Sequence, residues 1–282
     1  MRFDWSKMGR IPPAALVEAR NLAHHAAQWP AKAARANLSA VPDDSHSAFT
    51  WDASHAALVS RVLPAKGGGV RVGIRVARLE LIVTSGDSVL DAFQFDGKTD
   101  AAAGAWIDSK LHTLGLKPAG RVNLPYALPD PAGGRPLALG MLGRELGELS
   151  RWFSGPAEVL EEFAGRLAGL RPGPGPLLCW PHHFDMATLV RLDAGAGESA
   201  RSVGVGVSPG DEFYAQPYVY VSPWPRLQGS LPDLPPPGHW RTEGFFGAVV
   251  TGEDILAMKD RGKALLAFIT GAFEIARARL GA

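Results

Sequence analysis

The 282-residue sequence contains a single cysteine, Cys179. One cysteine cannot form an internal disulfide, so we expect a fold that does not depend on an oxidising compartment. The sequence also lacks any apolar run near the ~18 residues that a membrane-spanning helix needs. Its first ten residues, MRFDWSKMGR, lack the long apolar stretch of a signal peptide. These absences predict a soluble, cytoplasmic protein with no membrane partner.

An excess of charge of either sign is also missing. Lysine and arginine together number 29 and aspartate and glutamate 28, which gives a formal net charge of +1. Such a chain has no global field to attract nucleic acid or anionic lipid. Arg71, Arg75 and Arg78 form a local basic face, but no aromatic side chains alternate with them. We interpret this face as solvated surface and expect no nucleic-acid partner.

Complete catalytic and cofactor motifs are absent as well. The sequence has no G-x-S-x-G nucleophile elbow, and Cys179, between Leu178 and Trp180, is typical of a small buried apolar residue. The glycines of GVGVSPG (204–210) and of 67–69 are not followed by a helix, which a dinucleotide-binding turn requires. The motifs therefore indicate neither a nucleophilic enzyme nor an identifiable cofactor.

Hydrophobic spacing predicts strands that gather into hairpins, with several helices between them. Val70, Val72, Ile74 and Val76 alternate with polar residues or glycine, which is typical of a half-buried strand. Further strands are expected at 79–84, 89–95, 121–128, 177–180, 186–192, 201–207, 213–221 and 245–250. Helices are expected at 13–37 with a break before Ala31, at 100–114, at 139–170 with an interruption at Gly155-Pro156, and from Thr251 to the C-terminal end.

Clustered hairpins favour an α+β fold over a doubly wound α/β sheet. We expect mostly antiparallel sheets in two halves, each packed by long amphipathic helices. Residues 129–136 (PDPAGGRP) are nearly all proline, glycine and charge, so they are the predicted boundary. The halves are then 1–130 and 137–282, packed together into one compact unit.

Ionisable side chains are most concentrated in the segment CWPHHFDMATLVRL (179–192). His182, His183 and Asp185 are of the types that ligate zinc or iron. In an extended strand, His183 and Asp185 would share one face while His182 would point to the other. A third ligand would then have to come from elsewhere, and candidates are His46, Asp211 and His239. The alternative is that these are surface or turn histidines, and we assign no metal.

A tyrosine-rich strand is the best binding feature in the sequence. Tyr218 and Tyr220 share a strand face, Tyr214 precedes them, and Asp211 lies where the segment begins. Tyrosine combines apolar area with a hydroxyl group. Together with Asp185, these residues predict a pocket for a small polar or aromatic ligand. Tyrosines packed into an ordinary sheet are an equally good interpretation.

Several segments resemble a widespread bacterial family catalogued only as a domain of unknown function. They are LAHHAAQWPAK (22–32), DDSHSAFTWD (43–52), RLELIVTSGD (78–87), HHFDMA (182–187) and GVGVSPGDEFYAQPYVYVSP (204–223). The resemblance implies functional polar positions at His24 or His25, Gln28, Lys32, His46 and Asp185. The family has small residues where this chain has His182 and His183, so the resemblance favours Asp185 over both histidines. It implies no known activity.

Three functional hypotheses follow from these features. The leading one is a small-molecule-binding protein with a pocket near Asp185, Asp211 and the tyrosines. The alternative is a metal-dependent or acid–base enzyme that uses His182 or His183 with Asp185. A third is a partner-binding module that presents the proline-rich residues 222–240, since extended proline segments bind aromatic grooves.

Overall fold

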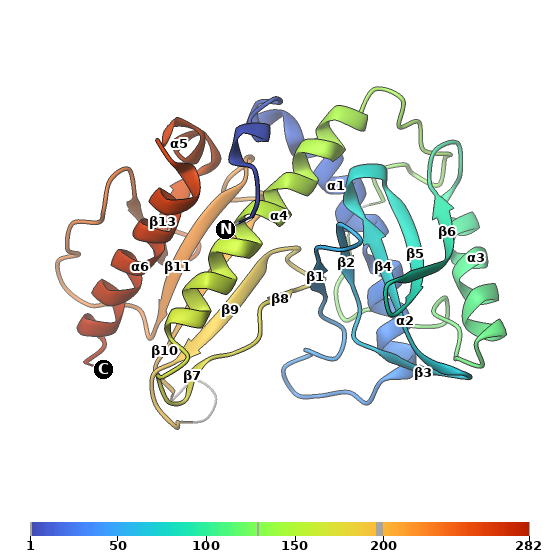
Figure 1. Ribbon diagram of the computed structural model, residues 1–282, viewed down its shortest axis with the longest axis horizontal. Coiled ribbons are helices and arrows are strands. Elements are labelled where there is room, and N and C mark those ends of the chain that lie inside the picture. The colour runs from blue at the N-terminus through green and yellow to red at the C-terminus, as the bar shows by residue number, and fades with distance from the viewer. Residues whose placement is uncertain (1, 129, 196–199, 282) are drawn as a thin grey trace. The chain divides into compact units, whose positions relative to one another are not determined.

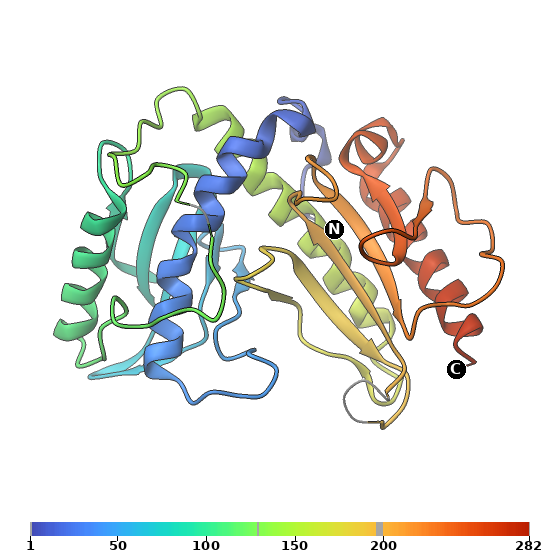
Figure 2. The ribbon, with the colours of Figure 1, turned by 180° about the vertical axis from the view of Figure 1, so that it is seen from behind.

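The computed structural model describes residues 2–128, 130–195 and 200–281. It contains 34% helix and 24% strand, with antiparallel sheets (Figures 1 and 2). The α+β class predicted from the sequence is therefore confirmed. Within the described residues, no helix is both long and apolar enough to cross a membrane.

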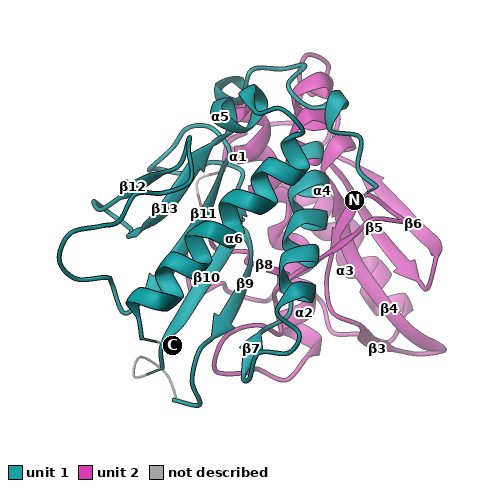
Figure 3. Ribbon diagram, turned by 60° about the vertical axis from the view of Figure 1, so that its left-hand side comes forward, with its two compact units in different colours: residues 1–15, 151–177, 185–282 teal, residues 16–150, 178–184 magenta. Residues whose placement is uncertain are grey.

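The chain divides into two compact units, each built from more than one segment (Figure 3). Unit 1 comprises residues 1–15, 151–177 and 185–282, and unit 2 comprises residues 16–150 and 178–184. The predicted division placed one boundary at 129–136. The contacts between residues instead place one boundary between residues 150 and 151, inside a long helix, and assign residues 178–184 to unit 2. Sequence composition does not reveal such an exchange, because it depends on contacts between distant segments.

Unit 2 combines an antiparallel sheet with several helices. Its strands are β1 (Thr50–Asp52), β2 (Ala57–Val59), β3 (Leu63–Ala65), β4 (Gly68–Arg75), β5 (Glu80–Ser85) and β6 (Ser88–Gln94), and β8 (Leu178–Cys179) bridges to Phe49. The sheet order is β1-β2-β4-β5-β6, with β3 paired to β4. Its helices are α1 (Val17–Ala26), α2 (Gln28–Asn37) and α3 (Asp100–Thr113), and a 3₁₀ turn, η3 (Val76–Arg78), joins β4 to β5.

The buried residues of unit 2 follow the alternation seen in the sequence. Val72 and Ile74 of β4 are fully buried, and α2 packs against both β4 and α3. Gly104 of α3 allows the approach of α2, because a Cβ atom there would lie 2.6 Å from the Trp29 ring. Apolar periodicity thus selects the strands, and one glycine sets the spacing between two helices.

Two predictions in this unit are wrong. The first helix breaks at Ala27 and not before Ala31, because Pro30 is the third residue of α2, where its missing N–H removes no intrahelical bond. Residues 121–128 form no strand. Their apolar members instead line a pocket described below.

Unit 1 contains the second antiparallel sheet, in the order β12-β13-β11-β10-β9-β7. These strands are β7 (Gly173–Pro174), β9 (Met186–Arg191), β10 (Ser202–Ser208), β11 (Tyr218–Trp224), β12 (His239–Arg241) and β13 (Gly247–Thr251). Helix α6 (Arg261–Arg279) packs against β10 and β11, and α5 (Gly252–Ala257) precedes it. The 3₁₀ turns η1 (Trp5–Lys7) and η2 (Pro13–Leu16) lie near the N-terminus.

Helix α4 (Gly143–Arg166) crosses the boundary between the units without a break. The interruption predicted at Gly155-Pro156 is wrong, because Pro156 is accommodated inside the helix. A Cβ atom at position 155 would lie 2.8 Å from the Phe3 ring, so the glycine makes room for aromatic packing on the helix. Here tertiary contacts override the helix-breaking tendency of the two residues.

Local signals near the C-terminus give a mixed outcome. The capping box predicted at Thr251 and Asp254 is present. The single long helix expected after it is wrong, because Asp260 adopts a left-handed conformation with φ 49° and separates α5 from α6. The strand expected from Phe213 starts only at Tyr218.

The proline-rich loop is held to its own unit at several points. Arg279 donates to the carbonyls of Gln228 and Ser230, and the Trp240 indole donates to Pro232. A Cβ atom at Gly238 would lie 2.2 Å from the Phe268 ring. This loop is anchored to α6, which argues against the partner-binding hypothesis in the form of a freely presented 222–240 segment.

Candidate functional site

The two adjacent histidines lie in a turn and not in a strand. Residues 181–183 form the turn, Phe184 has φ 61°, and β9 begins only at Met186. The strand geometry predicted for this segment is therefore wrong. Phe184 is the last residue of this piece of unit 2, and Asp185 is the first of the following piece of unit 1.

Aromatic rings surround His182. Its ring centroid lies 4.3 Å from that of His183, 5.8 Å from that of Tyr126 and 6.1 Å from that of Trp180. Burial, followed by the charge of His183, lowers the pKa of His182. Among the residues that the structure describes, no group of three or more His, Cys, Asp or Glu side chains is arranged to hold a metal ion.

His24 and Gln28 fix this turn to helices α1 and α2. The His24 ring stacks on Phe184 at 4.9 Å, and its Nε2–H donates to the Pro181 carbonyl at 2.8 Å. The Gln28 amide donates to the same carbonyl at 3.0 Å and to the His24 carbonyl at 2.8 Å. Burial lowers the pKa of His24 to about 4, so the ring is neutral at pH 7.

A pocket of about 220 Å³ opens beside Gln28. The Tyr126 hydroxyl donates to Gln28 Oε1 at 2.8 Å, which leaves the Gln28 amide fully engaged. Burial raises the pKa of Tyr126 to about 12, so it remains a donor at physiological pH. The pocket is lined by His25, Gln28, Trp29, Lys32, Asp100, Val122, Asn123, Leu124, Tyr126 and Leu128.

The polar contacts of this pocket centre on Asp100 and Lys32. The Trp29 indole donates to Asp100 Oδ1 at 2.7 Å, and His25 Nε2 lies 3.3 Å from the same oxygen. Burial opposes ionisation of Asp100, but these hydrogen bonds outweigh it and lower the pKa of the carboxyl group. The Lys32 ammonium lies 4.6 Å from the Trp29 ring centroid. Within the described residues, no carboxylate lies within 4 Å of the Lys32 ammonium.

Of the residues implied by the family resemblance, Gln28, Lys32 and one of the two alternative histidines, His25, thus line one pocket, whereas His46 and Asp185 do not. His46 is buried elsewhere in unit 2, where its Nδ1 lies 3.9 Å from Asp44 and accepts from the Val41 N–H at 3.5 Å. Burial lowers its pKa. Its contacts hold the 41–46 turn and do not reach the pocket lining.

The predicted tyrosine–aspartate residues gather on one face of the unit 1 sheet. Tyr218 donates to Asp211 Oδ2 at 2.5 Å, and Tyr220 donates to Asp185. Burial, with the charge of the accepting carboxylate, raises the pKa of both tyrosines well above the ordinary value. Both phenols therefore stay protonated, and each hydroxyl donates its hydrogen bond to a carboxylate of the protein.

Tyr214 lies at the border of this cluster. Its ring centroid is 4.8 Å from that of Tyr218, and its hydroxyl lies 2.9 Å from His239 Nε2. The Arg241 guanidinium lies 5.0 Å from the Tyr214 ring centroid and 4.9 Å from that of Phe213. These contacts pack the edge strand β12 onto the turn that precedes β11.

Sequence reasoning missed Trp29, Asp100, Asn123 and Tyr126 as members of the unit 2 pocket. They come from helix α2, the start of helix α3 and an irregular segment, and they are far apart in the chain. The adjacency of Trp29 to Gln28 was the one local signal available. No protein-family model matches this sequence, and no curated protein or solved structure matches it at a significant level. The family resemblance therefore stays a prediction.

Proposed function

We propose that the protein binds a small organic anion in the unit 2 pocket lined by Gln28, Lys32 and Tyr126. The observation that carries this proposal is the Lys32 ammonium. It lines a cavity and makes no ion pair with the described residues. Ligand pockets combine apolar walls with a few convergent polar groups, and this one has both.

The pocket walls favour a carboxylate joined to a compact, flat apolar body. Val122, Leu124 and Leu128 supply aliphatic surface, and Trp29 supplies a ring beside the ammonium. About 220 Å³ is below the range of drug-sized sites, so the ligand is a small one. Asp100 accepts from Trp29 and His25, and the nearby charge of Lys32 helps to lower the pKa of its carboxyl group, but Lys32 makes no direct ion pair that would keep a ligand carboxylate away.

Gln28 and Tyr126 act here as supports and not as ligand-binding groups. Every hydrogen-bonding group of the Gln28 amide is engaged, and it joins α2 to the 181–183 turn and to Tyr126. Such internal satisfaction keeps the pocket wall in one arrangement. A rigid wall lowers the ordering cost of binding.

Calorimetric titration with benzoate, phenylacetate and 4-hydroxybenzoate, and with neutral benzamide, tests the proposal. A charge-assisted hydrogen bond contributes about 1.5–3 kcal/mol. We therefore expect Lys32→Gln to weaken carboxylate binding by about 10- to 100-fold. Lys98→Gln is the matched control, since Lys98 also lies 4.6 Å from an aromatic ring, that of Phe93, but outside this pocket. Failure of all three carboxylates to bind, or equal binding by Lys32→Gln, would overturn the proposal.

A further inference from the structure

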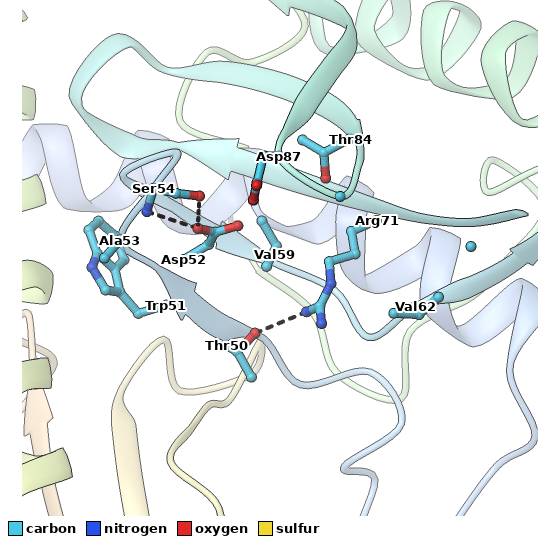
Figure 4. A pocket seen from close by; sticks show the side chains of 12 residues that line it. Thr50, Trp51, Asp52, Ala53, Ser54, Val59, Val62, Arg71, Thr84 and Asp87 are labelled. Carbon is cyan, nitrogen blue, oxygen red and sulfur yellow. Dashed lines mark hydrogen bonds between the residues drawn. The ribbon is translucent and has the colours of Figure 1, made fainter.

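A second and larger opening lies on the unit 2 sheet, with a volume of about 650 Å³ (Figure 4). It is lined by Thr50, Trp51, Asp52, Ala53, Ser54, Val59, Val62, Gly69, Arg71, Thr84, Gly86 and Asp87. We refer to these twelve residues as the Arg71 groove. None of them lines the Lys32 pocket.

The groove contains one cation without an ionic partner. Arg71 is half-buried, and its Nη1 donates to Thr50 Oγ1 at 3.3 Å and to the Ser60 carbonyl at 3.2 Å. Within the described residues, no carboxylate lies within 4 Å of its guanidinium. Guanidinium presents five N–H donors in a fork that matches a carboxylate. The Nη1 bonds hold that fork in place, and its other donors remain for a ligand.

A carboxylate without a partner lies in the same groove. Asp87 is exposed, and its backbone carbonyl faces His55 Nε2 at 3.2 Å, but its side chain bonds to no other described residue. Asp52 differs, because it accepts from Ser54 at 2.6 Å and from His55 at 2.9 Å. In Figure 4, Val59 is drawn between Asp52 and Arg71. The groove therefore offers a free cation, a free anion and one exposed apolar side chain, that of Val62.

Hydrolytic catalysis does not fit this arrangement. Ser54 Oγ lies 3.1 Å from His55 Nδ1, the nitrogen that also faces Asp52. In a catalytic triad the serine and the aspartate face opposite nitrogens of the imidazole. Here His55 Nε2 faces a backbone carbonyl instead. The contacts among Asp52, Ser54 and His55 hold the turn that follows β1, and they assemble no catalytic triad.

We propose that the Arg71 groove binds a small zwitterion, an amino acid or short peptide, with its carboxylate on Arg71 and its ammonium on Asp87. Val62, whose side chain is exposed, contacts the apolar part of the ligand. A cation and an anion that line the same groove select a molecule that carries both charges. A simple anion lacks the second contact.

Titration with L-leucyl-L-leucine, its N-acetyl form and its C-terminal amide tests this inference. We expect the dipeptide to bind and each capped form to bind at least about tenfold more weakly, the loss of one charged contact. Arg71→Gln should lower dipeptide affinity, whereas Arg78→Gln, which removes an exposed charge outside the groove, should not. Asp87→Asn, at an exposed position, should abolish discrimination against the N-acetyl form without affecting folding.

Two results would overturn the inference. One is the absence of binding by the dipeptide and by free L-leucine. The other is binding that Asp87→Asn and Arg71→Gln both leave unchanged. Because the probes and the variants differ from those for the Lys32 pocket, failure of one site is distinguishable from failure of the other.

Discussion

The Tyr220 hydroxyl donates a hydrogen bond to the Asp185 carboxylate, and it does so across Gly206. Tyr220 on β11 pairs with Gly206 on β10, which pairs with Ala187 on β9. A Cβ atom at position 206 would lie 2.6 Å from the Tyr220 hydroxyl and 2.7 Å from the Ala187 Cβ. The absence of a side chain at Gly206 therefore leaves room for the Tyr220 ring to reach Asp185 across β10.

Gly206→Ala should displace the Tyr220 ring and break its hydrogen bond to Asp185. Overpacking typically costs about 1–3 kcal/mol, and a buried polar group that loses its partner costs about as much. We expect the free energy of unfolding, measured with urea, to fall by at least ~2 kcal/mol. Gly204→Ala, in the same strand, is the control, because the nearest atom to its Cβ lies at 3.8 Å. Equal effects of both substitutions would contradict this role for Gly206.

Acid should destabilise the protein through His24. Its pKa is about 4 in the folded state, against an ordinary value of 6.5. Below pH 6.5 the unfolded state therefore binds the proton more readily, and stability falls as the pH drops from 6.5 towards 4. The contribution is complete above pH 6.5 and amounts to about 3 kcal/mol.

Urea unfolding between pH 7 and pH 4 measures this effect. His24→Gln should flatten the dependence of unfolding free energy on pH, whatever its cost at neutral pH. His112→Gln changes an exposed histidine and should leave the slope as it is. A slope that persists in His24→Gln would show that other groups govern acid sensitivity.

The Thr251 capping box should contribute measurably to stability. Thr251 Oγ1 accepts from the Asp254 N–H at 3.3 Å, and Asp254 accepts from the Thr251 N–H at 3.1 Å. Loss of such an N-cap costs about 1 kcal/mol, so Thr251→Ala should lower the unfolding free energy by that amount. Thr242→Ala removes an exposed threonine that is not a helix cap and should have almost no effect. Equal unfolding free energies of the two variants would show that the Thr251 cap does not contribute to stability.

What the sequence predicted well was local. Strand alternation located β4 and β5, and the spacing of Thr251 and Asp254 identified a real helix start. Long-range packing decided the failures. Pro156 stays inside a helix because aromatic residues pack against the adjacent glycine. Asp260 interrupts the helix predicted from Thr251 onward, because it adopts a left-handed conformation. Hydrophobic spacing does not reveal such a conformation.

The same distinction applies to the candidate sites. Asp185 and the tyrosines were predicted to line one pocket. The structure joins Asp185 to Tyr220 by a hydrogen bond, and the ligand pocket at these residues stays a prediction. Lys32 and Gln28 were implied by the resemblance, but nothing local connected them with Asp100 or Tyr126. Arg71 was predicted to belong to a solvated basic face with Arg75 and Arg78, because the chain has no excess of positive charge and no aromatic side chains alternate with these arginines. That pattern gave no indication that Arg71 and Asp87 line one groove.

The most direct test of the central claim is to follow the Trp29 indole N–H signal by ¹H–¹⁵N NMR during a benzoate titration. Trp29→Phe assigns the signal among those of the eight tryptophans. Because the Trp29 ring contacts Lys32 and its N–H donates to Asp100, a carboxylate bound at Lys32 should shift this signal in a saturable manner. The shift should vanish in Lys32→Gln and persist in Lys98→Gln. A Trp29 signal that stays unmoved at saturating benzoate, or moves equally in Lys32→Gln, would contradict the account.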